Sequence, residues 1–134
     1  MHHESRPLTV DIVDGDARVR QQVEHLLRRV GYRTQAYSQA EELLHALDSD
    51  GGEEVACIIS ELELPGMDGL SLLRDLRKRR LDVPVIILTA DSSVGTAVVA
   101  MRSSVADYVT KPFVERDLLR RLKAALARHG TEVN

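Results

Sequence analysis

Short apolar runs alternate with stretches of helical hydrophobic spacing along the whole chain. The runs at 8–13, 55–59 and 83–88 are rich in valine, isoleucine and leucine, which is typical of a strand buried on both faces of a parallel sheet. Between the runs, apolar residues recur three and four positions apart, as on one side of an amphipathic helix. The runs predicted to form strands are 8–13, 32–37, 55–59, 83–88 and 106–110. The pattern therefore predicts five strand–helix units.

Local signals refine two of the helices. Ser38 is followed three positions later by Glu41, which is the spacing of a capping box, so this pair is predicted to begin the second helix. The fourth helix is expected to bury Ala97, Val98 and Met101, because their spacing places them on one side.

The alternation of strands and helices also predicts the architecture. Parallel strands joined by helical crossovers carry helices on both faces, so the predicted fold is α/β, a three-layer αβα sandwich. We expect one domain over 8–130, with short tails at 1–7 and 131–134.

Composition narrows the class of protein. The 134 residues are 43% hydrophobic, which suits one globular domain with its own core, and the single cysteine, Cys57, lies within an apolar run as a core residue would. No apolar run approaches the roughly 20 residues that cross a bilayer, and residues 1–8 lack the centre of a signal peptide. We therefore expect a cytoplasmic protein without membrane contact. The net charge of -3 gives no basic surface, so direct nucleic-acid binding is not expected.

Polar side chains stand where the predicted strands end. Because the carboxyl ends of parallel strands meet at one edge of the sheet, these residues are expected to lie close together. They are Asp14 and Asp16 after the first strand, Glu61 after the third, Thr89 after the fourth and Lys111 after the fifth. A single strand-end aspartate usually caps the next helix. Carboxylates, a hydroxyl and a lysine together predict a site for a divalent cation and a phosphoryl group.

Five motifs then identify a family. The segments IVDGDARVR, IISELELPGMDGL, VIILTA and AVVAMRSSVADYVTKPF, with the helix that follows, resemble the receiver domain of two-component response regulators over about 8–128. The sequence pattern is most similar to that of receivers of the nitrogen-fixation and LuxR-type regulators. This resemblance implies a flavodoxin-like fold with strand order 2-1-3-4-5 and a signalling module that is not itself an enzyme. It also implies that Thr89 and Lys111 contact a phosphoryl group. The inward or outward rotamer of Tyr108 is then expected to indicate the activation state of the domain.

Two residues depart from the family pattern. Receivers take phosphate from a histidine kinase on an aspartate with Mg²⁺ bound, but Glu61 stands at the acceptor position. Its extra methylene moves the carboxylate by about 1.5 Å, and even 1 Å can cost on the order of a hundredfold in rate. Gly15 replaces the second acid after the first strand, a metal ligand in the family, which leaves Asp14 and Asp16 as the candidate metal ligands. For Asp16 the alternative is a helix cap, which we favour. We expect Glu61 not to be phosphorylated, no required cofactor, and weak Mg²⁺ binding at most.

The resulting hypothesis is a phosphorylation-independent receiver-like module that acts through protein contacts. Its expected partners are a sensor histidine kinase or another signalling protein, and a second copy bound through the fourth helix, fifth strand and fifth helix. A Glu61–Lys111 ion pair is predicted to replace part of the effect of phosphate.

Two alternatives stay open at this point. One is a conventional phospho-accepting receiver that regulates a transcriptional output domain. The other, weaker one is a flavin-binding flavodoxin-type domain, which the acidic loop at Asp14 and the absence of tryptophan disfavour.

Overall fold

The computed structural model describes residues 7–50 and 55–130. Within them, five parallel strands form one sheet in the order β2-β1-β3-β4-β5. The strands are β1 (Thr9–Val13), β2 (Arg33–Tyr37), β3 (Val55–Ser60), β4 (Val85–Thr89) and β5 (Asp107–Thr110). The predicted strand order is confirmed, and strand boundaries differ from the expected ones by one or two residues. The tails predicted at 1–7 and 131–134 lie outside the described residues, apart from Pro7.

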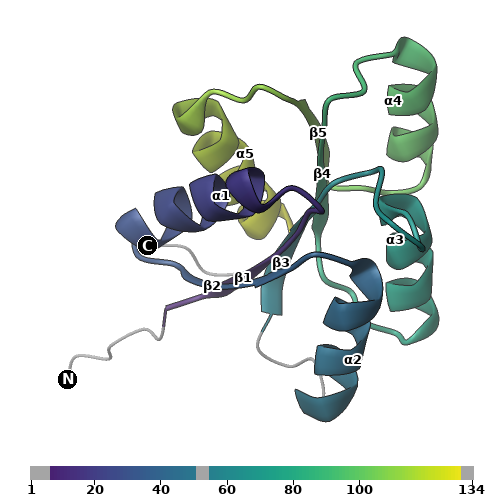
Figure 1. The fold of residues 1–134 in the computed structure, drawn as a ribbon, viewed down its shortest axis with the longest axis horizontal. Helices are drawn as coiled ribbons and strands as arrows, with labels where there is room; N and C mark the ends of the chain where they lie inside the picture. The colour runs from purple at the N-terminus through teal and green to yellow at the C-terminus, as the bar shows by residue number, and fades with distance from the viewer. Residues whose placement is uncertain (1–6, 51–54, 131–134) are drawn as a thin grey trace.

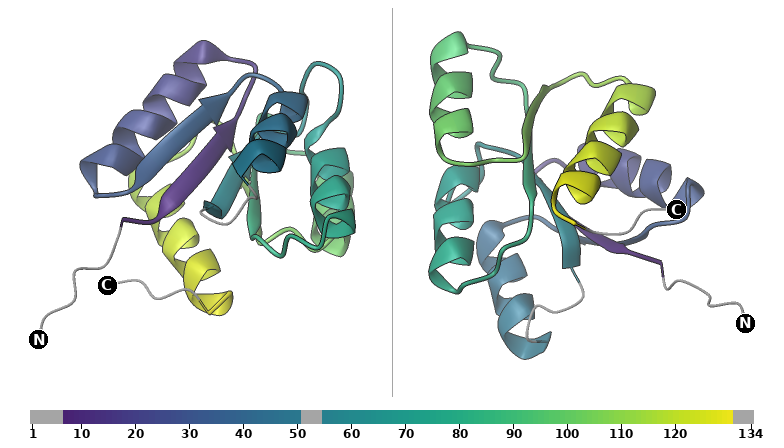
Figure 2. Two further views of the ribbon diagram at one scale, coloured as in Figure 1. Left: turned by 90° about the horizontal axis from the view of Figure 1, so that it is seen from below. Right: turned by 180° about the vertical axis from the view of Figure 1, so that it is seen from behind.

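Helices cover both faces of the sheet, as Figures 1 and 2 show. They are α1 (Ala17–Arg29), α2 (Ala40–Asp50), α3 (Gly69–Lys78), α4 (Val94–Arg102) and α5 (Glu115–Arg128). Helices α1 and α5 pack against one face and α2, α3 and α4 against the other, with a separate hydrophobic cluster in each layer. The predicted three-layer αβα sandwich is therefore confirmed.

The central strands explain the continuous apolar runs. Every residue of β1 and β4 is buried. In β4, Ile86 and Leu88 pack against α1 and α5, whereas Val85 and Ile87 pack against α2 and α3. Because successive side chains of a strand point to opposite faces, a strand covered on both sides needs apolar residues at consecutive positions.

The start of α2 differs from the predicted capping box. The helix begins at Ala40, so Glu42 is its third residue, and the Glu42 carboxylate accepts the N–H groups of Ser38 at 2.9 Å and Gln39 at 3.2 Å. Glu41 was the wrong partner for Ser38. Its carboxylate accepts the N–H of Met67 at 3.0 Å instead and so ties α2 to the loop between β3 and α3.

The predicted inward face of α4 is also wrong. Val98 is 42% exposed and Met101 52% exposed, Ala97 is half-buried, and Ala100 is the buried residue of this helix. Apolar residues surround most of α4, so their spacing does not select one face. The helix lies at the β5 end of the sheet, where less of its surface is covered (Figure 1).

Cys57 is a core residue, as predicted. It is free and fully buried in β3, and burial raises the pKa of its thiol to about 12. The thiol is therefore uncharged and unreactive near neutral pH. In the described part of the chain, no helix is long and apolar enough to cross a membrane.

Candidate functional site

Lys111 joins two carboxylates at the carboxyl edge of the sheet. Asp14 directly follows β1, Glu61 follows β3, and Lys111 follows β5. The Lys111 ammonium donates to Asp14 Oδ2 at 2.8 Å and to Glu61 Oε1 at 2.7 Å. The predicted Glu61–Lys111 pair is confirmed, and Lys111 bridges β1 and β3 as well.

The second oxygen of Glu61 is held by the backbone. Glu61 Oε2 accepts the N–H of Leu62 at 2.5 Å and the N–H of Glu63 at 3.1 Å. Gly69 allows this loop to pass close to α3, because a Cβ at that position would lie 2.6 Å from the Glu61 carbonyl oxygen. Both carboxylate oxygens of Glu61 are therefore engaged by donors from this chain.

Burial and hydrogen bonding oppose each other in this cluster. Burial raises the pKa of Glu61, but hydrogen bonds from Lys111, Thr89 and the Glu63 N–H outweigh it, so the pKa lies below its usual value. Burial lowers the pKa of Lys111, and its bonds to Asp14 and Glu61 more than reverse that effect. Glu61 and Lys111 consequently stay ionised across the neutral range.

Thr89 and Tyr108 connect the site to the loop between β4 and α4. Thr89 is buried, and its hydroxyl accepts the N–H of Asp91 at 3.3 Å in addition to bonding Glu61. The Tyr108 hydroxyl donates to the Asp91 carbonyl oxygen at 2.5 Å. Burial, with the negative charges of Asp91 and Glu61, raises the pKa of Tyr108. The predicted switch residues therefore meet on the same loop, at Asp91.

The donor set at this edge does not fit Mg²⁺. Asp14 Oδ1 accepts the N–H of Asp16 at 2.9 Å, and Asp14 Oδ2 accepts from Lys111. Asp16 caps α1 as predicted, accepting the N–H of Arg18 at 2.9 Å, and Gly15 offers no side chain. Among the described residues, no group of three or more histidine, cysteine, aspartate or glutamate side chains is placed to hold a metal ion. A hard cation needs several free oxygen ligands, which these residues do not supply.

Three contributors to the site escaped the sequence analysis. They are the N–H groups of Leu62 and Glu63 on Glu61, and Arg20, which donates to the Asp14 carbonyl oxygen at 2.6 Å. Backbone donors carry no residue-type signal. Arg20 gave a weak signal in the sequence, because it lies in the first turn of α1, directly after the loop that carries Asp14.

Sheet order and site together define the class of protein. A parallel sheet of order 2-1-3-4-5 with a carboxylate–lysine cluster at its carboxyl edge is the arrangement that the receiver resemblance implies. The family model of the response regulator receiver domain matches residues 10–123. The chain belongs to this family.

Relatives support the same assignment. The chain is 34% identical over 118 residues to the DNA-binding transcriptional regulator NtrC of Proteus hauseri. The aligned region covers 88% of this chain and 24% of that protein. It is 30% identical over 115 residues to the transcriptional regulatory protein FixJ of Bradyrhizobium diazoefficiens, covering 86% of this chain and 55% of FixJ. The chain thus spans about a quarter to about half the length of these relatives.

Solved structures agree with the fold. The signal receiver domain of an HD domain-containing protein from Pseudomonas fluorescens superposes with a TM-score of 0.84 at 28% identity, covering 95% of this chain and 100% of that one. The FixJ-N crystal structure gives a TM-score of 0.79 at 29% identity, with 92% and 96% coverage.

Proposed function

We propose that this receiver domain of two-component signalling works without phosphorylation, through protein contacts that its site stabilises permanently. The single observation that carries the proposal is the engagement of both Glu61 oxygens, one by Lys111 and the other by the Leu62 and Glu63 amides. The finding that the chain is a receiver domain is independent of this proposal.

Phosphoryl transfer to Glu61 faces two obstacles. An attacking carboxylate oxygen must leave its donors and align with the phosphorus atom, and Glu61 would give up a charged hydrogen bond of 2.7 Å to Lys111 to do so. The transferred group also needs cationic stabilisation, which kinases and related enzymes supply with metal ions. Asp14 is already bonded to Lys111 and Asp16, and Gly15 adds no ligand. We infer that the domain needs no cofactor and binds Mg²⁺ weakly.

Glu61 takes over part of the role of a phosphoryl group in this proposal. Its carboxylate occupies Lys111 and Thr89, the groups that the family resemblance assigns to phosphate recognition. One carboxylate carries a single charge, whereas a phosphoryl group carries about -1.5 to -2 and three acceptor oxygens. Glu61 therefore biases the domain toward one conformation only partially.

The same proposal includes the partners. Receiver domains of two-component systems interact with histidine kinases, and this domain acts by binding such a protein rather than by catalysis. A second copy is proposed to bind the face made by α4, β5 and α5, where Val94, Val98 and Met101 are exposed beside Tyr108. Exposed apolar patches of this kind mark interaction surfaces.

Incubation with acetyl phosphate and Mg²⁺, followed by intact-mass measurement, tests the proposal. We expect no covalent addition to the wild-type chain. A stoichiometric gain of about 80 Da, the mass of one phosphoryl group, would contradict it and favour a conventional phospho-accepting receiver. A receiver domain that carries the family's aspartate acceptor is the positive control for the reagent.

A further inference from the structure

The loop between β3 and α3 holds one oxygen of Glu61 through its backbone. Glu61 Oε2 accepts the N–H groups of Leu62 and Glu63, which both belong to this loop. The Gly69 N–H donates to the Leu62 carbonyl oxygen at 2.9 Å and closes the base of the loop. Leu62 is buried at this base, whereas Glu63 is exposed and lies one residue closer to the tip. The position of the Glu63 N–H therefore depends on how the tip of the loop is fixed.

Glu41 of α2 contacts the tip of this loop. Its Oε2 atom accepts the Met67 N–H at 3.0 Å. The carboxylate also lies directly against Gly66, because a Cβ at that position would be 2.6 Å from Glu41 Oε2. Gly66 has φ of +78°, so it combines a left-handed backbone with the close approach of another side chain. A side chain at position 66 would therefore displace the Glu41 carboxylate.

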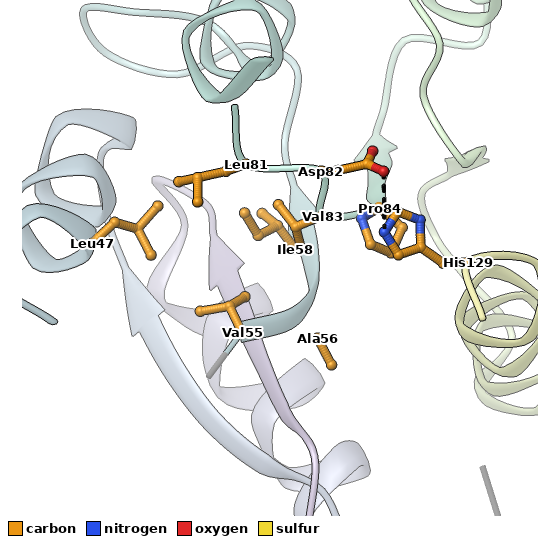
Figure 3. A pocket seen from close by; sticks show the side chains of 9 residues that line it. All are labelled: Leu47, Val55, Ala56, Ile58, Leu81, Asp82, Val83, Pro84 and His129. Atoms are coloured by element: carbon orange, nitrogen blue, oxygen red, sulfur yellow. Dashed lines mark ion pairs between the residues drawn. The ribbon is translucent and has the colours of Figure 1, made fainter. Parts of the chain in front are cut away.

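The helix that carries Glu41 is itself anchored to the rest of the fold. Leu47 of α2 and Val55 of β3 line the same small pocket where β3 and β4 begin (Figure 3). Further along α2, Asp48 forms an ion pair with Arg79, the residue directly after α3. Helix α2 is therefore held against both β3 and α3, and it gives Glu41 a fixed position beside the loop.

We propose that Glu41 is a positioning residue for Glu61: from α2 it fixes the tip of the β3–α3 loop, whose amides hold Glu61 Oε2. The two oxygens of Glu61 are then held from separate parts of the fold, one by Lys111 after β5 and the other by a loop that α2 supports. The inference rests on the proposed function for its effect on signalling, because a loosened Glu61 would bias the domain less. Its test does not depend on whether Glu61 takes up phosphate.

Amide hydrogen exchange of the folded protein, followed by NMR, tests the proposal. Glu41→Ala removes the acceptor at the loop tip, so the Glu63 amide should exchange about tenfold faster, the effect of one lost hydrogen bond on local opening. The Leu62 amide at the closed base should change less. Glu41→Gln keeps an oxygen acceptor and should restore most of the protection. Unchanged protection of Glu63 in Glu41→Ala would overturn the proposal, and so would equal losses in the two variants, which would assign the effect to charge alone.

Gly66→Ala disturbs the same contact from the side of the loop. Because the added Cβ displaces the Glu41 carboxylate, the Glu63 amide should again exchange faster, and adding Glu41→Ala should have little further effect. Gly31→Ala is the matched control, since Gly31 has φ of +104° but a Cβ there would meet no described atom within 4 Å. It carries backbone strain without the contact and should leave Glu63 protected. Equal acceleration in Gly31→Ala would refute the assignment.

Urea unfolding separates a failure of this inference from a failure of the proposed function. The effects of Glu41→Ala and Glu61→Gln on the free energy of unfolding should be non-additive, because both changes act on the same loop. Additive effects would show that the influence of Glu41 ends at the loop tip, and would refute its positioning role even if the wild type takes up no phosphate. Phosphate uptake by a wild type with the expected exchange results would support the positioning role and contradict the proposed function alone.

Discussion

At Glu61, one additional methylene places a carboxylate where donors from three elements converge. Lys111 follows β5, Thr89 ends β4, and the Leu62 and Glu63 amides follow β3. Charged hydrogen bonds in a buried setting are stronger than neutral ones, so this residue joins three strand ends through one side chain. Removal of the Glu61 carboxylate should therefore disturb all three strand ends.

Glu61→Gln keeps the size and removes the charge. We expect it to lower the free energy of unfolding by about 1.5–3 kcal/mol near neutral pH, the range for a hydrogen bond to a charged group. Because the folded-state pKa of Glu61 is lowered, this contribution is fully present above its ordinary pKa of 4.5 and is lost as pH falls through the folded value. Urea unfolding of both proteins at several pH values measures the difference.

The exposed residue Glu63 provides the matched control, since Glu63→Gln changes the same functional group outside the ion pair. Its effect should be small and should not follow the acid profile. In Glu61→Gln, the amide NMR shifts around Tyr108 and the affinity for partners should change too. If both stay at wild-type values, Glu61 does not act as an internal activator.

Gly15 offers a second test at the level of single residues. A Cβ at this position would meet only Pro65 Cδ, at 3.6 Å, which is an ordinary contact. The Cβ of an aspartate at this position therefore meets no steric clash. We expect the double variant Gly15→Asp with Glu61→Asp to gain one phosphoryl group from acetyl phosphate and Mg²⁺, as measured by intact mass. The added negative charge beside Asp14 should cost about 1 kcal/mol of stability in the absence of metal.

Each single variant serves as the control for that experiment, since Gly15→Asp alone retains the misplaced acceptor and Glu61→Asp alone lacks the second acid. Both should take up much less phosphate than the double variant. A folded double variant that stays unmodified would show that other groups block the reaction.

Among the elements, the connection between α4 and β5 contains backbone strain. Ser104 has φ of +67°, in the left-handed region that costs a residue with a Cβ about 1–2 kcal/mol. A glycine would adopt this φ without strain, because it has no Cβ. The connection leads directly into β5, which carries Tyr108 and ends just before Lys111.

Ser104→Gly should therefore raise the free energy of unfolding by about 0.5–1 kcal/mol, since glycine removes the strain but gains freedom in the unfolded chain. Thermal or urea unfolding measures it. Ser103→Gly is the control, because Ser103 has φ of -87° and its hydroxyl donates to the Val99 carbonyl oxygen. That substitution should destabilise the protein. Equal effects of the two changes would exclude strain at Ser104.

The same elements show how far sequence reasoning reaches. Buried strands were recognised because runs such as 55–59 have no polar residue, and their parallel arrangement then brought Asp14, Glu61 and Lys111 to one edge. The inward face of α4 was missed, because its apolar residues surround the helix. The donors to Glu61 Oε2 and the acceptor for Tyr108 are backbone atoms, which no residue type reveals.

For the whole molecule, the exposed apolar residues of α4 carry the predicted self-association. Val94 is 78% exposed and lines a shallow groove together with Val98, Met101 and Tyr108. We expect Val94→Asp to weaken concentration-dependent dimerisation, seen by sedimentation velocity, without changing stability. Val30→Asp, an exposed valine at the end of α1, is the control and should leave the association unchanged. A Val94→Asp variant that dimerises like the wild type would place the interface elsewhere.

The open space at Gly15 has an evolutionary consequence. The glycine codons GGU and GGC become aspartate codons by a change of a single nucleotide, and so does either glutamate codon. A Cβ at Gly15 would meet only Pro65, and Lys111 already contacts both Asp14 and Glu61. Two substitutions, Gly15→Asp and Glu61→Asp, would therefore give this domain the full set of receiver acids. Selection on the signalling output, rather than the architecture, would hold it in the present state.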